Sequence, residues 1–379
     1  MLVIGLISGT SLDGIDAALL RIDGPLSAPD WSLVAFRTTP YTSGQRDEIH
    51  HGILRGGAAA LCRLHARLGE WFAAAALDLC ASANVQTRAV SWIGSHGQTV
   101  YHEPPAEGRR GCTLQLGCAA TIAERTRISV VSDFRSRDVA AGGHGAPLVP
   151  WVDGLLFAVP GKARVLVNVG GMANLTRVGP RGQNEPLLAF DTGPGNALID
   201  GMVEAATHGR TTFDRDGARG AAGTVDEALL DELFRDAYFA APPPKSTGRE
   251  IFGRQYVTAV AEGRRPATEQ DWNDLIATMT ALTARTIADA IRRWVLPRGA
   301  NQIVVTGGGA SNPTLMRMLA SRLTPLPVIS GREAGIDPDA KEAIAFAALA
   351  WAHAHRLPGN VPEVTGAAGP RVLGAVTPA

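Results

Sequence analysis

The sequence carries one unusual pattern twice: a short apolar strand, a turn of small residues, and a second strand. The first copy runs from Gly5 to Leu20 and turns at Ser8–Ser11. The second copy begins at Arg164 and turns at Gly170–Asn174. Because each copy must bury its own strands, the repeat predicts a chain of two similar halves. This restricts the possible folds more than any single motif does.

Apolar strands and helical stretches alternate around both copies. We expect strands at 2–7, 15–22, 31–39, 89–93, 128–131, 164–169, 175–178, 187–190 and 302–306. We expect helices at 57–83, 113–126, 147–157, 271–295, 313–323 and 339–355. The alternation predicts an α/β fold.

The predicted lobes are 1–145 and 146–355. Residues 207–270 are polar and interrupt the second copy, so we interpret them as an insertion whose role composition does not reveal. Whether the tail 356–379 packs back on the first lobe stays open.

Composition narrows the class of partner. Lys and Arg together number 36, as do Asp and Glu, so the net charge is zero and offers no field for nucleic acid or anionic lipid. The four cysteines form no C-x-x-C pair and no zinc-type spacing. The N-terminus lacks a secretory signal pattern, and the apolar runs are too short to span a membrane. We therefore expect a cytoplasmic protein with no nucleic-acid or membrane partner.

Three glycine-rich turns follow strands, near Gly9, Gly170 and Gly307. Such turns turn backbone N–H groups toward one point, which suits a phosphate, and glycine lets a nucleotide approach closely. Asp13 and Asp16 add carboxylates of the kind that a hydrated Mg²⁺ needs. Neither a P-loop motif nor a G-x-G-x-x-G after a strand is present. Taken singly, each turn is equally well explained as a plain polar hairpin.

Polar residues at three strand ends are candidates for substrate binding or catalysis. His96 lies in the turn Gly94–Thr99, where it either bonds a substrate hydroxyl or caps the turn. Asp133 and Arg135 lie in a charged loop that becomes glycine-rich, and such loops are often functional. Asp191 follows the apolar strand 187–190, and it either acts as a base or caps the turn.

Eight segments, in this order along nearly the whole chain, resemble those of the anhydro-N-acetylmuramic acid kinases, within the acetate and sugar kinase, Hsp70 and actin superfamily. They are GLISGTSLDGIDAALL, IGSHGQTVYHEP, SDFRSRDVAAGGHGAPLVP, NVGGMANLT, FDTGPGN, PPKSTGRE, TGGGASNPTLM and DPDAKEAIAFA. The resemblance implies two lobes of duplicated actin-like, ribonuclease H-like topology with a cleft between them. It also implies ATP-dependent conversion of 1,6-anhydro-N-acetylmuramic acid to N-acetylmuramic acid 6-phosphate in cell-wall recycling.

The resemblance also implies roles for particular residues, with ATP and Mg²⁺ as cofactors. Asp191 is expected to be the catalytic base, kept ionised by the start of a helix that Asn196 caps. Substrate contacts are expected from His96, Asp133, Arg135, Gly193, Gly195 and Glu342, and a metal contact through water from Asp13. ATP is expected to meet Gly9, Thr10, Ser11, Leu12, Asp13, Gly14, Ile15, Asp16, Gly170, Gly171, Asn174, Gly307, Gly308 and Gly309.

Two other classes of function remain to be separated from this one. An actin-like or chaperone-like ATPase would hydrolyse ATP without a sugar acceptor. A sensor would have lost the base, which the presence of Asp191 disfavours. The partner is expected to be a small anhydro-sugar, and the sequence leaves a homodimer open.

Overall fold

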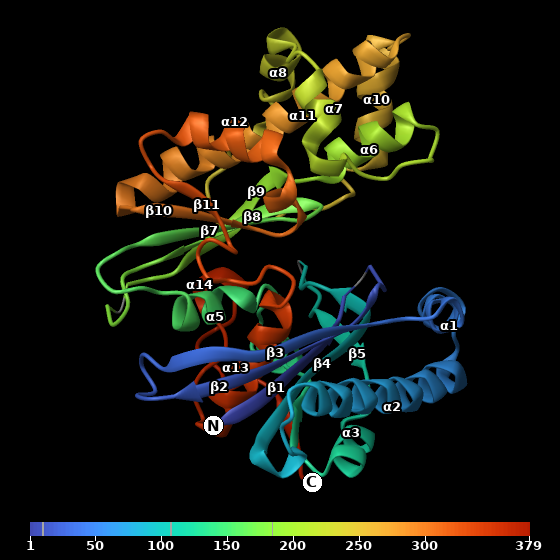
Figure 1. Cartoon of the computed structure of the whole chain (residues 1–379), viewed down its shortest axis with the longest axis vertical. Coiled ribbons are helices and arrows are strands. Elements are labelled where there is room, and N and C mark those ends of the chain that lie inside the picture. The colour runs from blue at the N-terminus through green and yellow to red at the C-terminus, as the bar shows by residue number, and fades with distance from the viewer. Residues whose placement is uncertain (10, 107, 184) are drawn as a thin grey trace. The chain divides into compact units, whose positions relative to one another are not determined.

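The computed structural model describes residues 1–9, 11–106, 108–183 and 185–379. The chain divides into two compact units, which Figure 1 colours along the sequence. Unit 1 comprises Met1–Phe157 and Asp339–Ala379, and unit 2 comprises Ala158–Pro338. These bounds differ from the predicted lobe boundaries at 145 and 355. The difference arises because the helices at 149–156 and 341–354 pack on unit 1, as described below.

Unit 1 holds a mixed sheet with helices on both faces. Its strands are β1 (Leu2–Ser8), β2 (Gly14–Asp23), β3 (Asp30–Pro40), β4 (Val90–Glu103), β5 (Cys112–Leu116), β6 (Val130–Ser132) and β12 (Ala375–Thr377). Its helices are α1 (Ser43–Arg55), α2 (Ala58–Ser82), α3 (Ala119–Thr126), α4 (Ser136–Ala140), α5 (Val149–Leu156), α13 (Lys341–Ala354) and α14 (Pro362–Thr365).

The period of two along β1 explains this layering. Ile4 and Leu6 enter one core together with apolar residues of α2. Gly5 faces the opposite way, toward α13: a Cβ there would lie 1.9 Å from the Ala343 carbonyl oxygen. Helices α2 and α13 therefore cover opposite faces of the sheet (Figure 1). Only glycine permits such a close approach of helix backbone to strand.

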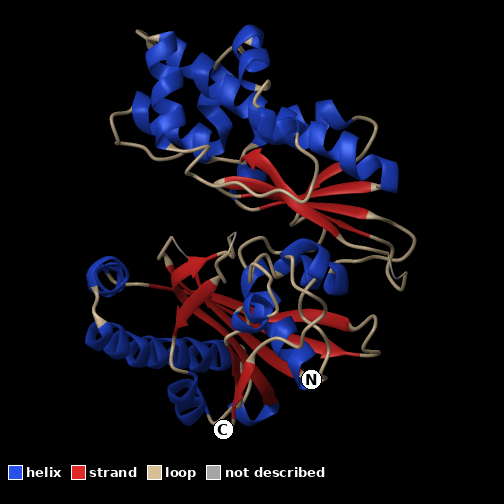
Figure 2. Ribbon diagram, turned by 180° about the vertical axis from the view of Figure 1, so that it is seen from behind, coloured by secondary structure: helices blue, strands red, loops and turns tan. Residues whose placement is uncertain are grey.

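Unit 2 holds a second mixed sheet and most of the remaining helices. Its strands are β7 (Arg164–Val169), β8 (Met172–Val178), β9 (Leu188–Pro194), β10 (Gln302–Thr306) and β11 (Val328–Ser330). Its helices are α6 (Ala197–Ala206), α7 (Ala218–Ala222), α8 (Glu227–Leu233), α9 (Ala237–Ala240), α10 (Arg254–Arg264), α11 (Glu269–Ala290) and α12 (Pro313–Leu323). Figure 2 shows most of these helices gathered on one side of the sheet.

The two sheets share one strand order. Unit 1 contains the run β6-β4-β1-β2-β3, and unit 2 has β11-β10-β7-β8-β9. In both, the first three strands in sequence form an antiparallel meander and the other two run parallel to the first. This duplication confirms the predicted α/β class with two similar lobes of actin-like topology.

Long-range pairing overturns three local predictions. Helix 113–126 is wrong in its first half, because Cys112–Leu116 pairs with β4 as β5. The same pairing carries β4 on to Glu103, so His96 lies within a strand and not in a turn. Pairing with β8 likewise extends β9 to Pro194 and keeps Asp191 inside the strand.

The interruption at 207–270 is helical, not merely polar. It contributes α7 to α10, and residues such as Leu230, Phe239 and Phe252 form one core with α6 and α11. Helix α11 begins at a capping box, in which Thr268 and Asp271 exchange hydrogen bonds, and it continues into a π-helical turn, Ile291–Val295. Among the described residues, no helix is long and apolar enough to cross a membrane.

Candidate functional site

The β1–β2 hairpin of unit 1 ends in a small turn that is stabilised by backbone hydrogen bonds. Leu12 N donates to the Gly9 carbonyl at 3.3 Å, and Tyr41 N donates to the Asp13 carbonyl at 3.1 Å. The side chain of Leu12 is buried in the core, with the backbone in the left-handed region (φ 56°). A Cβ on Gly9 would meet only Ser11 Oγ, at 3.6 Å. The described residues of the turn are thus hydrogen-bonded, and the space beside Gly9 is open.

The residues of this hairpin that were predicted to contact ATP differ in how far their side chains are buried. Leu12 and Ile15 place their side chains in the core, so only their backbone could meet a ligand. Gly14 packs tightly on β3, where a Cβ would lie 2.4 Å from the Thr39 carbonyl oxygen. Ser11 and Asp13 are exposed at the turn. The prediction for Thr10 falls outside the described residues.

The carboxylate of Asp16, in β2, lies near those of Asp13 and Asp339. Asp16 Oδ1 accepts from Thr38 Oγ1 at 2.6 Å. Burial raises the pKa of Asp16, and the neighbouring carboxylates of Asp339 and Asp13 raise it further. Their mutual repulsion makes this a negative region that a cation would relieve. Among the described residues, no three His, Cys, Asp or Glu side chains are grouped so that they could hold a metal ion.

His96, Arg135 and Glu342 form a second polar group in unit 1. Arg135 Nε donates to His96 Nε2 at 3.0 Å, so the imidazole proton lies on Nδ1, which meets the Gly97 carbonyl at 3.0 Å. Burial, aided by the Arg135 charge, lowers the pKa of His96 to about 3. Both ring nitrogens are thus engaged, and His96 supports Arg135 and its own strand instead of presenting a free nitrogen.

Glu342 lies in the first turn of α13 and interacts electrostatically with Arg135. Its side chain reaches solvent, yet protein surrounds it on most sides, and this desolvation raises its pKa. Asp16 raises that pKa further, whereas Arg135 and Lys341 lower it. The Arg135 guanidinium also donates to the Gly145 carbonyl, at 2.8 Å, through Nη1. The structure therefore brings His96, Arg135, Glu342 and Asp16 into one neighbourhood.

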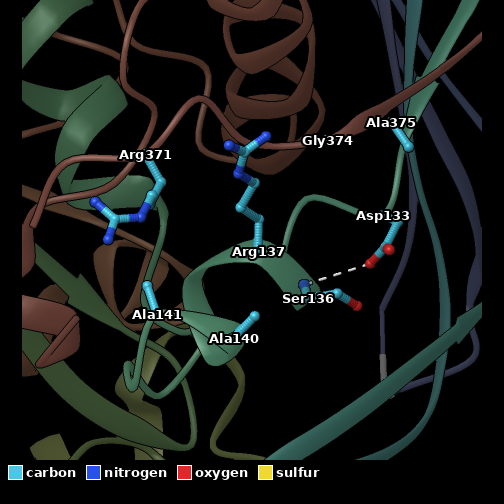
Figure 3. Close-up of a pocket in the computed structure, with 8 residues that line it drawn as sticks. All are labelled: Asp133, Ser136, Arg137, Ala140, Ala141, Arg371, Gly374 and Ala375. Carbon is cyan, nitrogen blue, oxygen red and sulfur yellow. Dashed lines mark hydrogen bonds between the residues drawn. The ribbon is translucent and has the colours of Figure 1, made fainter. Parts of the chain in front are cut away.

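Asp133 follows β6 and lines a separate hollow of unit 1. Its carboxylate accepts from Ser136 N at 3.3 Å at the start of α4. Figure 3 shows it across an open hollow from Arg137 and Arg371. His96, Arg135 and Glu342 are not among the residues that line this hollow. The sequence grouped Asp133 with Arg135, but the left-handed backbone at Asp133 (φ 56°) marks a sharp turn between them.

In unit 2, Asp191 is held by three hydrogen bonds from one distant segment. Thr247 N donates to Asp191 Oδ2 at 3.0 Å, and Asp191 N donates to the Lys245 carbonyl at 3.1 Å. Tyr238 Oη donates to the Asp191 carbonyl at 2.9 Å. Across the sheet Asp191 stands opposite Asn174, which lies within β8 and not in the predicted turn. Opposite residues share one face of a sheet, so both side chains point the same way.

Desolvation governs the chemistry of Asp191. Burial raises its pKa, and the Thr247 N–H lowers it in part. The predicted cause was different, namely a helix start that favours the ionised form, with Asn196 as its cap. Asn196 occupies the N-cap position of α6, but its side chain makes no capping bond and donates to the Val169 carbonyl at 3.3 Å. A raised pKa strengthens a carboxylate as a base near neutral pH.

The glycine turns of unit 2 converge on the tip of the β7–β8 hairpin. Gly195 N and Ala197 N donate to the Gly171 carbonyl at 2.9 and 3.0 Å. A Cβ on Gly195 would lie 2.3 Å from the Gly170 carbonyl oxygen, and one on Gly309 would lie 2.5 Å from the Val169 side chain. Gly307 has φ of 76°. The predicted residues Gly170, Gly171, Gly195 and Gly307–Gly309 therefore lie together, whereas Gly193 packs against the Phe239 ring.

Sequence reasoning missed the role of Tyr238, Lys245 and Thr247. The Lys245 ammonium donates to the Tyr238 and Phe239 carbonyls at 2.9 and 3.3 Å and lies 4.6 Å from the centre of the Tyr238 ring. For Lys245 and Thr247 the signal in the sequence was the segment PPKSTGRE, and Asp191 lies 56 positions before Thr247. Nothing in local periodicity links the two.

Comparison with known proteins gives one consistent result. The family model described as anhydro-N-acetylmuramic acid kinase matches residues 1–379. The chain is similar to the anhydro-N-acetylmuramic acid kinase of Gloeobacter violaceus, with 46% identity covering 100% of this chain and 99% of that protein. The corresponding protein of Rhodococcus erythropolis is 44% identical, with 100% and 94% covered. Among solved structures, a ROK family glucokinase from Streptomyces griseus in complex with glucose and AMPPNP is 12% identical, with 93% and 99% covered and a TM-score of 0.38.

Proposed function

This chain belongs to the anhydro-N-acetylmuramic acid kinase family, and from that premise we propose how its residues carry out the reaction. It is a sugar kinase. Its substrates are ATP and 1,6-anhydro-N-acetylmuramic acid, and its products are ADP and N-acetylmuramic acid 6-phosphate, in the recycling of peptidoglycan. The observation that carries the proposed mechanism is the environment of Asp191.

The acceptor sets an unusual chemical problem. In the anhydro-sugar O6 is tied to C1, so there is no 6-hydroxyl from which a base could take a proton. We propose that Asp191 instead removes a proton from a water molecule. The water oxygen attacks C1, the C1–O6 bond breaks, and O6 attacks the γ-phosphorus as the bond to ADP breaks. The proton passes to the carboxylate, so atoms and charges balance.

Asp191 suits this role for two reasons. Its burial favours proton uptake, because desolvation penalises the charged form. Its Oδ2 is oriented by Thr247 N–H, which fixes the carboxylate rotamer. Because the carboxylate is already held in one orientation, its surroundings need little reorganisation when the water loses its proton. Gly170, Gly171 and Gly307–Gly309 are proposed to meet the nucleotide on the same unit.

The proposed roles in unit 1 follow its two polar groups. Backbone N–H groups from Gly9 to Ser11 are proposed to meet phosphate, with Asp13 holding Mg²⁺ through water. The cation, when bound, would neutralise charge on the transferred phosphate. Arg135 and Glu342 are proposed to contact the sugar, with His96 positioning Arg135. Asp133 stays a weaker proposal, because its carboxylate is engaged at the start of α4.

The first test is Asp191→Asn, which keeps the shape of the side chain and removes the base. Loss of a general base typically lowers the rate by about 10²- to 10⁴-fold. The control is Asp231→Asn, which removes an exposed carboxylate paired with Arg285 in the same unit. Steady-state kinetics should separate the two variants. An Asp191→Asn enzyme within a few-fold of the parent would remove Asp191 from the mechanism.

The second test follows the oxygen. Reaction in ¹⁸O water should place the label on the C1 oxygen, with product trapped before the anomers exchange. Label in the phosphate would mean that water attacks phosphorus, and the coupled mechanism would then be abandoned. ADP release measured with and without anhydro-sugar separates this kinase from an actin-like ATPase, since only the kinase depends on the acceptor.

Two further proposals concern the setting of the enzyme. We propose that it works in the cytoplasm, where ATP is available, and fractionation of the producing cells tests this. A homodimer is the proposed alternative to a monomer, and static light scattering of the purified chain distinguishes them.

A further inference from the structure

Arg249 lies over the tip of the β7–β8 hairpin. A Cβ placed on Gly171 would come within 3.5 Å of both Nε and Nη2 of Arg249. The side chain is exposed, and among the described residues its guanidinium has no ion pair and no hydrogen bond. The hairpin of unit 1 differs, because a Cβ on Gly9 would meet only Ser11 Oγ. Among the described residues, no cation lies within 4 Å of a Cβ placed on Gly9, whereas the Arg249 guanidinium lies within that distance of one placed on Gly171.

The backbone that carries Arg249 is anchored on both sides. Before it, Lys245 and Thr247 hydrogen-bond the main chain and carboxylate of Asp191. After it, Phe252 is fully buried among the rings of Phe239, Tyr238 and Tyr256, and Phe252 N donates to the Gly248 carbonyl at 3.0 Å. The segment therefore places Arg249 at the hairpin while holding the proposed base.

The charge around Arg249 leaves it available for an anion. Arg249 has an electrostatic effect on Asp200 of α6, whose pKa burial raises to about 6 while Arg249 lowers it. The two groups form no ion pair within 4.0 Å among the residues that the structure describes. A guanidinium left without a carboxylate, above a glycine turn whose backbone is accessible, matches the planar oxygen pairs of a phosphate.

We propose that Arg249 binds the terminal phosphates of the nucleotide and stabilises their charge during transfer. This rests on the proposed function, because ATP is the phosphate donor there. The insertion at 207–270 thereby gains a role, because its residues 245–249 connect the proposed base to the proposed phosphate contact.

The experiment measures nucleotide binding by calorimetry without any sugar. ATP and AMP are compared in the full-length parent, in Arg249→Met and in Arg249→Lys. Arg249→Met should lose about 10- to 100-fold in ATP affinity, as expected for hydrogen bonds to a charged group. AMP affinity should stay within two-fold, since AMP lacks the terminal phosphates. The ATP affinity of Arg249→Lys should fall between those of the parent and of Arg249→Met. Lysine keeps the positive charge but lacks the planar guanidinium that donates two parallel hydrogen bonds.

Two controls test the assignment itself. Arg265→Met removes an exposed guanidinium at the far end of α10 and should leave ATP affinity unchanged. Asp200→Asn should not weaken ATP binding if Arg249 acts on phosphate directly. Parent-like ATP affinity in Arg249→Met, equal loss of ATP and AMP, or the same loss in Asp200→Asn would each overturn the proposal. If the parent fails to phosphorylate the sugar, the proposed function falls, but the ATP and AMP comparison still decides the role of Arg249.

Discussion

At the scale of single residues, two opposing effects set the pKa of Asp191: burial and one backbone N–H. Thr247 N–H lowers the pKa of Asp191 against the larger, opposing effect of burial. Replacing Thr247 by Pro removes that donor, so the pKa of Asp191 should rise further. Because the base works only when deprotonated, the acid limb of kcat/KM should move to higher pH.

The matched control is Thr247→Val, which keeps the N–H and removes only a hydroxyl that has no partner among the described residues. Its pH profile should coincide with that of the parent. Melting temperatures of both variants show whether either has lost its fold. An unshifted acid limb in a folded Thr247→Pro enzyme would mean that this hydrogen bond does not tune the base.

His96 should make stability depend on pH. Its pKa in the folded protein, about 3, lies below the ordinary histidine value of 6.5. A group with a depressed folded pKa stabilises the fold fully above pH 6.5 and loses that contribution as the pH falls toward 3. Within this window, protonation of His96 should lower the free energy of unfolding by about 1.4 kcal/mol for each unit by which the pH falls.

Chemical denaturation of the parent and of His96→Gln at several pH values isolates this effect, because the other titrating groups are common to both. The gap in free energy of unfolding should be largest at neutral pH and narrow toward pH 4. A constant gap would show that His96 does not titrate in this range.

At the scale of elements, the contact of α13 with the sheet depends on glycine. A Cβ on Gly5 would lie 1.9 Å from the Ala343 carbonyl oxygen, and one on Gly94 would lie 2.1 Å from that of Phe346. Gly5→Ala should therefore force the helix away from β1. Overpacking a core typically costs about 1–3 kcal/mol, and this clash is with backbone, so the loss should reach the upper part of that range.

Gly44→Ala is the control for this substitution. Gly44 lies in α1 and has nothing within 4 Å of a Cβ position. Alanine there should stabilise the protein by up to about 1 kcal/mol through helix propensity. In thermal and denaturant unfolding, the free energy of unfolding should fall below that of the parent in Gly5→Ala and rise above it in Gly44→Ala. Equal stabilities would mean that α13 can shift without cost.

At the scale of the whole molecule, the two units differ in how the chain builds them. Unit 2 is one continuous segment, Ala158–Pro338, with its own cores on α11 and α12. Unit 1 needs both ends of the chain, because α13 covers one face of its sheet and β12 pairs with β6. Residues 158–338 produced alone should fold cooperatively, whereas residues 1–157 alone should not.

Circular dichroism melting curves and hydrogen exchange of the two fragments check this expectation. Adding a linked copy of 339–379 to 1–157 should restore a cooperative transition, which serves as the positive control. A cooperatively folded 1–157 fragment would show that α13 is dispensable for unit 1.

The sequence alone determined the features that depend on near neighbours. The duplicated strands follow from the spacing of apolar residues, and α12 begins as predicted at Pro313 because Asn312 caps it, accepting from Leu315 N at 3.0 Å. The glycine turns at Gly9, Gly170 and Gly307 were also located correctly, since small residues between strands predict turns directly.

Only the tertiary structure decided what depends on distant partners. Residues 112–116 became a strand because β4 offered hydrogen-bonding partners, overriding a helical pattern. Asn196 gave up its expected capping role for the Val169 carbonyl, and His96 became neutral through burial beside Arg135. Burial raised the pKa of Asp191, and the Thr247 N–H oriented its carboxylate. Pairing and desolvation arise from segments far apart in the chain, so no local spacing of residues encodes them.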